Sequence, residues 1–223
     1  MRPDSFFAQR PRVKICCINS VEEARLAVRY GASALGLVSE MPSGPGVISE
    51  EEISEIARII PPGVASFLLT SKQNAEAVIE QQKRCRVNTI QLVDELIEGE
   101  YSDLRQALPG VALVQVVHVV GEESIEKAKE VAPFVDAVLL DSGNPNLEIK
   151  ELGGTGRTHN WEISRKLCAT IEKPVFLAGG LNPENVAKAV KSVQPYGIDV
   201  CNGVRTNDAL DAKKLSSFFN QLL

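Results

Sequence analysis

The chain has 223 residues and a net charge of −5, from 24 basic and 29 acidic residues. A nucleic-acid-binding surface usually shows as clustered Lys and Arg, and the sequence has no block of this kind. No apolar run is long enough to span a bilayer, and residues 1–11 lack the apolar centre of a signal peptide. We therefore expect a cytoplasmic protein with no nucleic-acid or membrane partner.

The cysteine and histidine pattern argues against a secreted disulfide framework and against a structural zinc site. The cysteines number five, an odd count, and three of them are far apart in the sequence. Cys16 and Cys17 are adjacent, so on a strand they would point to opposite sides and could not hold one metal ion together. The two histidines, His118 and His159, form no ligand pattern. We expect no bound metal.

Short apolar or β-branched runs recur along the chain and predict eight strands. They lie at 13–16, 34–38, 64–69, 89–93, 111–119, 136–141, 174–178 and 198–202. Segments with helical spacing follow them at 20–31, 49–60, 71–84, 102–108, 122–132, 160–171, 182–193 and 207–219. Several of these segments begin with Ser or Asn followed by acidic residues, which is typical of a helix N-terminus.

Strict alternation of strand and helix predicts parallel strands joined by crossover helices. Eight units of about 28 residues are close to the lower size of a (β/α)8 barrel. A doubly wound open sheet would usually carry a Gly-rich fingerprint after its first strand, whereas CCINS follows it here. We expect a single-domain (β/α)8 TIM barrel over residues 12–223, preceded by a flexible lead-in of residues 1–11.

Two glycine-containing stretches follow the last two predicted strands. AGGLN occupies residues 178–182 and CNGVRTN residues 201–207. In barrels of this kind phosphate often binds the loops after strands 7 and 8, and glycines before a helix leave backbone N–H groups to surround an anion. We expect a phosphate site there. The alternative is that the glycines only permit tight turns.

The first strand presents a lysine and a cysteine on one face. Lys14 and Cys16 share that face, and Val13 and Ile15 share the other. The apolar pair should face the helices, which directs Lys14 and Cys16 into the barrel mouth. A nearby ammonium favours a thiolate, so Cys16 is a candidate base or nucleophile near neutral pH, with an inert packed thiol as the alternative. Cys17 would be a small apolar residue off the barrel axis.

Asp141 ends the apolar run AVLLD of the sixth strand. A carboxyl flanked by apolar residues can be held protonated and so donate a proton, whereas the alternative is a solvated turn aspartate. Strands 1 and 6 both reach the barrel mouth. A thiolate on one and an acid on the other would suit a reaction that removes a C–H proton and protonates an oxygen.

Four segments resemble the phosphoribosylanthranilate isomerase family of tryptophan biosynthesis. VKICCI (13–18) is similar to the family's KICGI, and ELGGTGRTHNW (151–161) to its GGTG-x-x-x-x-W segment. LAGGLNPENVAKAV (177–190) resembles its LAGGL-x-P-x-N-V stretch, and GIDVCNGVRTN (197–207) its G-x-D-x-S-S-G-V-E strand end. The resemblance runs in register from residue 12 to the C-terminus.

The resemblance implies a barrel of the ribulose-phosphate-binding type that works without metal or organic cofactor, as a monomer or homodimer. It implies the Amadori rearrangement of N-(5-phosphoribosyl)anthranilate to 1-(o-carboxyphenylamino)-1-deoxyribulose 5-phosphate. By the same resemblance, Cys16 is the general base at sugar C2 and Asp141 the general acid at the ring oxygen. The implied substrate and phosphate contacts are Gly154, Gly156, Ala178, Gly179, Gly180, Asn202, Gly203 and Val204.

Three departures from the family concern the anthranilate end of the substrate. The family's arginine after strand 2 is absent from MPSGPGVIS (41–49), its QLHG is QLVD here, and Arg205 replaces a glutamate. A lost charge-assisted pair to a carboxylate is worth about 1.5–3 kcal/mol. Asp94, Arg157 and Arg205 are the candidate aglycone contacts.

The sequence leaves three functions open. The first is a phosphoribosylanthranilate isomerase with an altered carboxylate site. The second is a paralogous isomerase that acts on another phosphorylated sugar or sugar amine. The third, motivated by the altered loops, is a catalytically silent barrel that binds a phosphometabolite or a protein partner.

Overall fold

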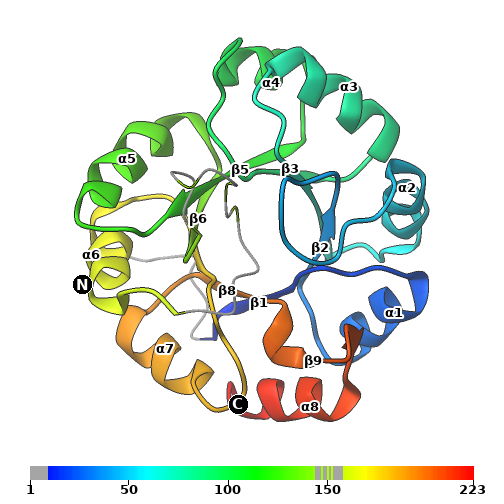
Figure 1. Cartoon of the computed structure of the whole chain (residues 1–223), viewed down its shortest axis with the longest axis vertical. Coiled ribbons are helices and arrows are strands. Elements are labelled where there is room, and N and C mark those ends of the chain that lie inside the picture. Colours follow the sequence, from blue (N-terminus) through cyan, green and yellow to red (C-terminus); the bar gives the residue numbers. More distant parts are fainter. Residues whose placement is uncertain (1–9, 144–146, 148–149, 151, 153–157) are drawn as a thin grey trace.

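The computed structural model describes residues 10–143, 147, 150, 152 and 158–223. In sequence order, eight parallel strands close into a barrel, and β8 (Gly197–Val200) pairs with β1 (Arg12–Ile15). The view down the barrel shows the helices as an outer ring around the strands (Figure 1). The predicted (β/α)8 fold is confirmed. The proposed lead-in, residues 1–11, lies almost entirely outside the described residues.

The elements follow the predicted order. The remaining strands of the barrel are β2 (Ala34–Val38), β3 (Ala65–Thr70), β4 (Thr89–Leu92), β5 (Ala112–His118), β6 (Ala137–Asp141) and β7 (Val175–Leu177). The helices are α1 (Val21–Arg29), α2 (Glu50–Ile59), α3 (Ala75–Cys85), α4 (Tyr101–Ala107), α5 (Glu123–Val131), α6 (Trp161–Thr170), α7 (Val186–Val193) and α8 (Ala212–Asn220). Two 3-10 turns, η1 (Ala132–Phe134) and η2 (Asn202–Val204), supplement them.

The helix N-termini carry the polar caps that the sequence indicated. Ser20 accepts a hydrogen bond from the backbone N–H of Glu23, and Asn74 and Asn160 cap α3 and α6 in the same way. Ser49 and Glu52 form a complete capping box at the start of α2. Such caps satisfy backbone donors that have no partner inside the helix, and so they fix where each helix begins.

The segment 207–219 was predicted as one helix, and this prediction is wrong. A short hairpin of β9 (Arg205–Thr206) and β10 (Ala209–Leu210) comes first, and Asp211 then caps α8. Asn207 and Asp208 form the two-residue turn with φ of 49° and 61°. Asn and Asp tolerate this left-handed conformation, which matches the twist of a tight hairpin, and it interrupts the helical pattern.

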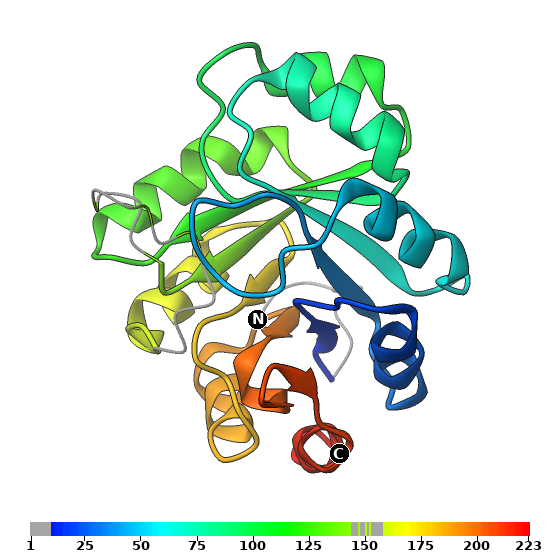
Figure 2. The same cartoon turned by 45° about the vertical axis from the view of Figure 1, so that its right-hand side comes forward.

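The two faces of the barrel strands pack into two different apolar layers. Val13 and Ile15 belong to the layer between strands and helices, whereas Cys16 belongs to the inner layer with residues such as Phe67 and Phe176. The predicted facing of the first strand is therefore confirmed. Figure 2 shows β1 and β8 side by side, with the hairpin and α8 beneath them. This junction brings the ends of both strands to one site.

Candidate active site

A cavity of about 280 Å³ opens at the C-terminal ends of the strands. Cys16 and Asp141 both line it, as the sequence predicted. Residues from β2, β3, β4 and β8 and from the loops after β1, β2, β7 and β8 complete its walls. Its lining, as far as the described residues go, contains no Lys or Arg.

A buried polar cluster forms the floor of the cavity beneath Cys16. The ammonium of Lys14, fully buried, donates to Asp199 Oδ2 at 2.9 Å and to Cys16 Sγ at 3.4 Å. It also lies 5.3 Å from the centre of the Phe67 ring, within cation–π range. Gly36 on β2 makes this packing possible, because a Cβ there would lie 2.7 Å from Cys16 Sγ and 2.9 Å from Lys14 Nζ.

The protonation of Cys16 differs from the expectation that Lys14 would favour a thiolate. Burial, the largest cause, and the Asp199 carboxylate together raise the pKa of Cys16 to about 11, because the ammonium of Lys14 only partly opposes them. Burial also raises the pKa of Asp199, against the effect of Lys14. Lys14 keeps its proton: burial alone would lower its pKa, but Asp199 and Cys16 outweigh burial and raise it. Cys16 is therefore a thiol in the resting site.

Asp141 ends β6 with its carboxyl at the cavity wall and only 8% of its surface exposed. Its Oδ1 accepts a hydrogen bond from the backbone N–H of Ser142 at 2.7 Å. Burial raises the pKa of Asp141, and the nearby carboxylate of Asp199 adds to this, against the Ser142 bond and His118. The carboxyl is thereby disposed to hold a proton that it can donate, as the sequence indicated.

The loops after β7 and β8 meet at one side of the cavity. Ala178, Gly179, Gly180, Asn202 and Gly203 line it. Gly179 and Gly180 have φ of 84° and 61°, and no acceptor for their N–H groups is found among the described residues. A side chain at Gly203 would collide with the carbonyl of Leu181, so the two loops can touch only at a glycine.

Of the other predicted substrate and phosphate contacts, Val204 is the one that lies among the described residues. Val204 is fully buried behind this side of the cavity and does not line it. Gly154, Gly156 and Arg157 lie outside the described residues. Leu152, nearby in sequence, does line the cavity.

Arg205 was a candidate aglycone contact, and the structure places it elsewhere. Its guanidinium forms two bonds to the Glu23 carboxylate, at 2.9 Å and 2.7 Å, and donates to the carbonyls of Asp208 and Cys17. Arg205 is 8% exposed and absent from the cavity lining. Glu23, the acid that pairs with Arg205, lies on α1, 182 residues away in the sequence. The sequence pattern could not reveal a pair between such distant residues.

Replacing Glu23 with glutamine is expected to lower the free energy of unfolding by about 3–5 kcal/mol, because it leaves a buried guanidinium without its counter-charge. Urea unfolding measures the change. Glu22, the preceding residue, is exposed, so Glu22→Gln is the matched control and should cost less than about 0.5 kcal/mol. Equal small losses in both variants would contradict a structural role for Arg205.

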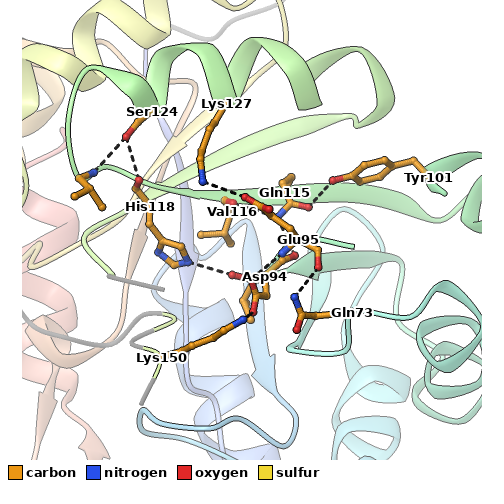
Figure 3. A network of polar contacts seen from close by, with 12 residues as sticks. Gln73, Asp94, Glu95, Tyr101, Gln115, Val116, His118, Ser124, Lys127 and Lys150 are labelled. Carbon is orange, nitrogen blue, oxygen red and sulfur yellow. Dashed lines mark hydrogen bonds and ion pairs between the residues drawn. The ribbon is translucent and has the colours of Figure 1, made fainter. Parts of the chain in front are cut away.

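Asp94, the third candidate, lies beside the main cavity. It forms an ion pair with Lys150, and Val93 and Asp94 line a smaller neighbouring cavity of about 120 Å³ with His118. Figure 3 shows Lys150 and His118 approaching the end of β4, where His118 Nε2 lies 3.1 Å from the carbonyl oxygen of Val93. The backbone carbonyl of Lys150 accepts from Ser43, a residue of the main cavity. The Asp94–Lys150 pair therefore stands at the cavity rim.

Cys17 is not a small apolar residue facing away from the barrel, as was expected. It forms a disulfide with Cys201, with the two Cα atoms 5.9 Å apart, and both residues line the cavity. The strand ends at Ile15, so strand alternation no longer governs Cys17, whose φ is 62°. The odd cysteine count argued against a secreted disulfide framework, and it did not anticipate this single bond.

The described residues show neither a metal cluster nor a membrane-spanning helix. No cluster of three or more His, Cys, Asp or Glu side chains able to hold a metal ion occurs among them. Within the same residues, every helix is too short or too polar to cross a membrane.

The family assignment rests on the length of the sequence match. A family model described as N-(5'-phosphoribosyl)anthranilate (PRA) isomerase matches residues 13–221. The chain belongs to this isomerase family. An N-(5'-phosphoribosyl)anthranilate isomerase of Methanocella arvoryzae is 32% identical over 212 residues, which cover 95% of this chain and 97% of the relative. The second such isomerase of Methanosarcina mazei is 34% identical, with 94% and 93% covered.

Solved structures of the family agree. The phosphoribosyl anthranilate isomerase of Thermotoga maritima has a TM-score of 0.79 and 29% identity, covering 95% of this chain and 98% of that one. A family structure in complex with reduced 1-(o-carboxyphenylamino)-1-deoxyribulose 5-phosphate has a TM-score of 0.76 and 27% identity, with the same coverage. Relatives of this family therefore share the barrel along almost its whole length.

Sequence reasoning missed several residues of the site. Gly36 makes room for Lys14 and Cys16, and Asp199 accepts a hydrogen bond from the ammonium of Lys14. The available signal was strand alternation, which puts Asp199 of β8 on the same face as Cys201 just after that strand; in the structure Asp199 is the register partner of Lys14 on β1. The Lys150 ion pair had no signal in the sequence pattern.

Proposed function

We propose that this chain catalyses the Amadori rearrangement of N-(5'-phosphoribosyl)anthranilate to 1-(o-carboxyphenylamino)-1-deoxyribulose 5-phosphate. The observation that carries the proposal is that a buried thiol and a buried carboxyl, Cys16 and Asp141, line one cavity in a chain of this isomerase family. The reaction needs one group that removes a C–H proton and one that protonates an oxygen. These two side chains supply both.

Asp141 and Cys16 act in sequence on the bound sugar. Asp141 donates its proton to the ring oxygen, which breaks the bond from that oxygen to C1 and leaves a protonated imine at C1. Cys16 then takes the proton from C2 and gives an enaminol. The enaminol gains a proton at C1 and loses the proton of its 2-hydroxyl, which yields the aminoketone and returns both side chains to their starting states.

The Cys16 thiol must lose its proton before it can act as a base, and its neighbours provide an acceptor. Lys14 bridges Cys16 and Asp199, and the raised pKa of Asp199 makes its carboxylate a ready acceptor. Oδ1 of Asp199 is buried and has no partner among the described residues. A proton passed from Cys16 to Asp199 leaves the net charge of the cluster unchanged, and Lys14 then faces a thiolate.

The phosphate end of the substrate is proposed to lie at Gly179, Gly180, Asn202 and Gly203. Support comes from the glycine N–H groups at the loop after β7 and from the close approach of the two loops at Gly203. Oriented backbone N–H groups bind anions without a charged side chain. This suits a cavity whose described lining carries no Lys or Arg.

The aglycone end is proposed to lie toward Asp94 and the loop after β2, where this chain departs from the family motif. Lys150 neutralises Asp94, which otherwise would repel an anthranilate carboxylate. Because the described lining offers that carboxylate no cation, a paralogous isomerase that acts on a phosphorylated sugar amine without a carboxylate is the second candidate.

A coupled assay tests the proposed function. N-(5'-phosphoribosyl)anthranilate is generated in situ, and its fluorescence decays as the chain isomerises it. We expect decay that depends on protein concentration, and growth of a tryptophan auxotroph that lacks the isomerase. Folded protein that gives neither result would overturn the proposal. Turnover of a phosphoribosylated amine without a carboxylate would then favour the second candidate.

A further inference from the structure

The Cys17–Cys201 disulfide joins the loops after β1 and β8 at the cavity wall. The two residues are 184 positions apart, so the bond links the start of the barrel to its end. Cys16, Cys85 and Cys168 are buried thiols that take no part in this disulfide. The proposed reaction uses Cys16 and leaves the disulfide without a role.

Cys17 lies where several loops meet. Its carbonyl oxygen accepts a hydrogen bond from Arg205, which is itself held by Glu23 of α1. Gly46, in the loop after β2, packs so closely that a Cβ there would lie 2.5 Å from the Cβ of Cys17. A bond at Cys17 therefore restrains loops on both sides of the barrel closure.

Cys201 connects the bond to the phosphate end of the cavity and to solvent. It directly precedes Asn202 and Gly203, and it is half-buried, whereas Cys17 is 4% exposed. Asn202 Oδ1 lies 3.4 Å from its sulfur and would accept the S–H bond of a reduced Cys201. The reduced state thus has a polar partner at hand, and, because Cys201 is the more exposed of the two, a small thiol can reach it first.

The positions of the two cysteines indicate that the pair matters as a pair. Cys17 has a φ of 62°, a conformation that favours glycine, and the family motif KICGI has glycine there. The family's strand-8 motif has serine where Cys201 stands. Two cysteines replace these residues at touching positions, one of them in a strained conformation. A disulfide between the two residues offsets the backbone strain at Cys17.

We propose that Cys17 and Cys201 are a reversible thiol–disulfide site that controls how firmly the phosphate end of the cavity is held. Oxidation occurs by exchange with a low-molecular-weight disulfide. The Cys201 thiolate attacks it and releases one thiolate, and the Cys17 thiolate then attacks the mixed disulfide and releases the second. Two protein S–H protons pass to the two released thiolates, so the small disulfide is reduced as the protein pair is oxidised.

The test begins with the wild-type chain equilibrated in oxidised glutathione or in dithiothreitol. A thiol titration of the denatured, acid-quenched chain should count three free cysteines when oxidised and five when reduced. Peptide mapping should identify the Cys17–Cys201 link. Oxidation should raise Tm by about 5–15 °C, because the cross-link constrains the unfolded chain. It should also tighten inorganic phosphate binding roughly threefold to tenfold, since a held cradle loses less entropy on binding.

Variants separate the pair from other cysteines. Cys17→Gly, which suits the left-handed backbone, and Cys201→Ser should each abolish the dependence of Tm and phosphate affinity on redox state. Cys85→Ala is the matched control, because Cys85 is buried in α3 away from the cavity, and it should keep that dependence. A KM that rises on reduction with little change in kcat is expected in addition, and this kinetic part rests on the proposed function.

Three results would overturn the proposal. One is a count of five thiols after oxidation. Another is a link to Cys16 instead of Cys201. The third is phosphate affinity that stays the same while the thiol count changes. None of these readouts needs turnover, so absence of isomerase activity would overturn the proposed function and leave this inference standing or falling on its own data.

Discussion

Replacing Cys16 with alanine is expected to lower kcat/KM for N-(5'-phosphoribosyl)anthranilate by about 10²–10⁴-fold, the usual contribution of a general base. Cys16→Ser should be similarly impaired, because a hydroxyl gives up its proton less readily than a thiol. Most of the loss should appear in kcat, since the substitution leaves the proposed phosphate contacts untouched. Fluorescence decay under saturating and limiting substrate separates the two constants.

The control for this prediction is another buried cysteine. Cys85→Ala also removes a buried thiol, yet Cys85 does not line the cavity, so its kcat should stay within about twofold of wild type. Substrate deuterated at C2 gives a second readout, because proton removal at C2 should slow the wild-type reaction. If Cys16→Ala turned over substrate at the wild-type rate, another residue would have to be the base.

The parts of the fold that the sequence predicted are those that depend on local spacing. Alternation with a period of two placed Lys14 and Cys16 on the inner face of β1, and the structure confirms it. Ser and Asn before acidic residues marked helix starts, because capping is decided within one turn. The shared edge of a parallel barrel then placed Cys16 and Asp141 at one cavity.

The parts that escaped prediction depend on contacts between distant segments. Arg205 was expected at the substrate, but its charge is taken by Glu23, 182 residues away. Cys17 was expected to be a small apolar residue off the barrel axis, but it forms a disulfide with Cys201, which it meets only when the barrel closes. No periodicity describes such contacts, because they arise from the closure of β8 on β1.

The charge state of Cys16 escaped prediction for a related reason. Proximity to Lys14 argued for a thiolate, whereas full burial and the Asp199 carboxylate raise the pKa of Cys16 to about 11. Desolvation depends on the whole environment, and a sequence shows only neighbours along one strand. The same burial raises the pKa of Asp141, so one physical effect accounts for both the proposed acid and the need to activate the proposed base.

Replacing Asp141 with asparagine is expected to reduce kcat/KM by about 10²–10⁴-fold, because asparagine has no proton to donate to the ring oxygen. Wild-type activity should fall as pH rises through the raised pKa of Asp141, since only the protonated carboxyl acts as an acid. The variant should lack this decline. A pH profile of kcat/KM for both proteins checks the assignment, and an unchanged decline in the variant would contradict it.

Asp141→Asn should also stabilise the chain at neutral pH, whereas replacing an aspartate with only a structural role should not. The pKa of Asp141 is raised by folding, so the folded state binds its proton more tightly and loses stability as pH rises from the ordinary aspartate pKa of about 3.9 through the folded value. Asparagine stays neutral and avoids this cost. Tm of Asp141→Asn should exceed that of wild type at neutral pH, and the difference should shrink near pH 3.

Folding shifts the pKa of Asp136, just before β6, in the opposite direction from that of Asp141. Burial raises its pKa, but bonds from Arg105 at 2.7 Å and from the N–H of Leu113 at 2.8 Å outweigh burial and lower it. Its ionised form therefore stabilises the fold above its unfolded pKa, and that stability is lost as pH falls through the lowered value. Asp136→Asn should lower Tm at neutral pH while leaving kcat nearly unchanged.

The two substitutions, at opposite ends of β6, would then change stability in opposite directions. Only Asp141→Asn would lose activity and gain stability. A loss of stability in the wild-type chain is the cost expected when a carboxyl is buried for catalysis. If both substitutions lowered Tm equally, Asp141 would be serving the fold and not the reaction.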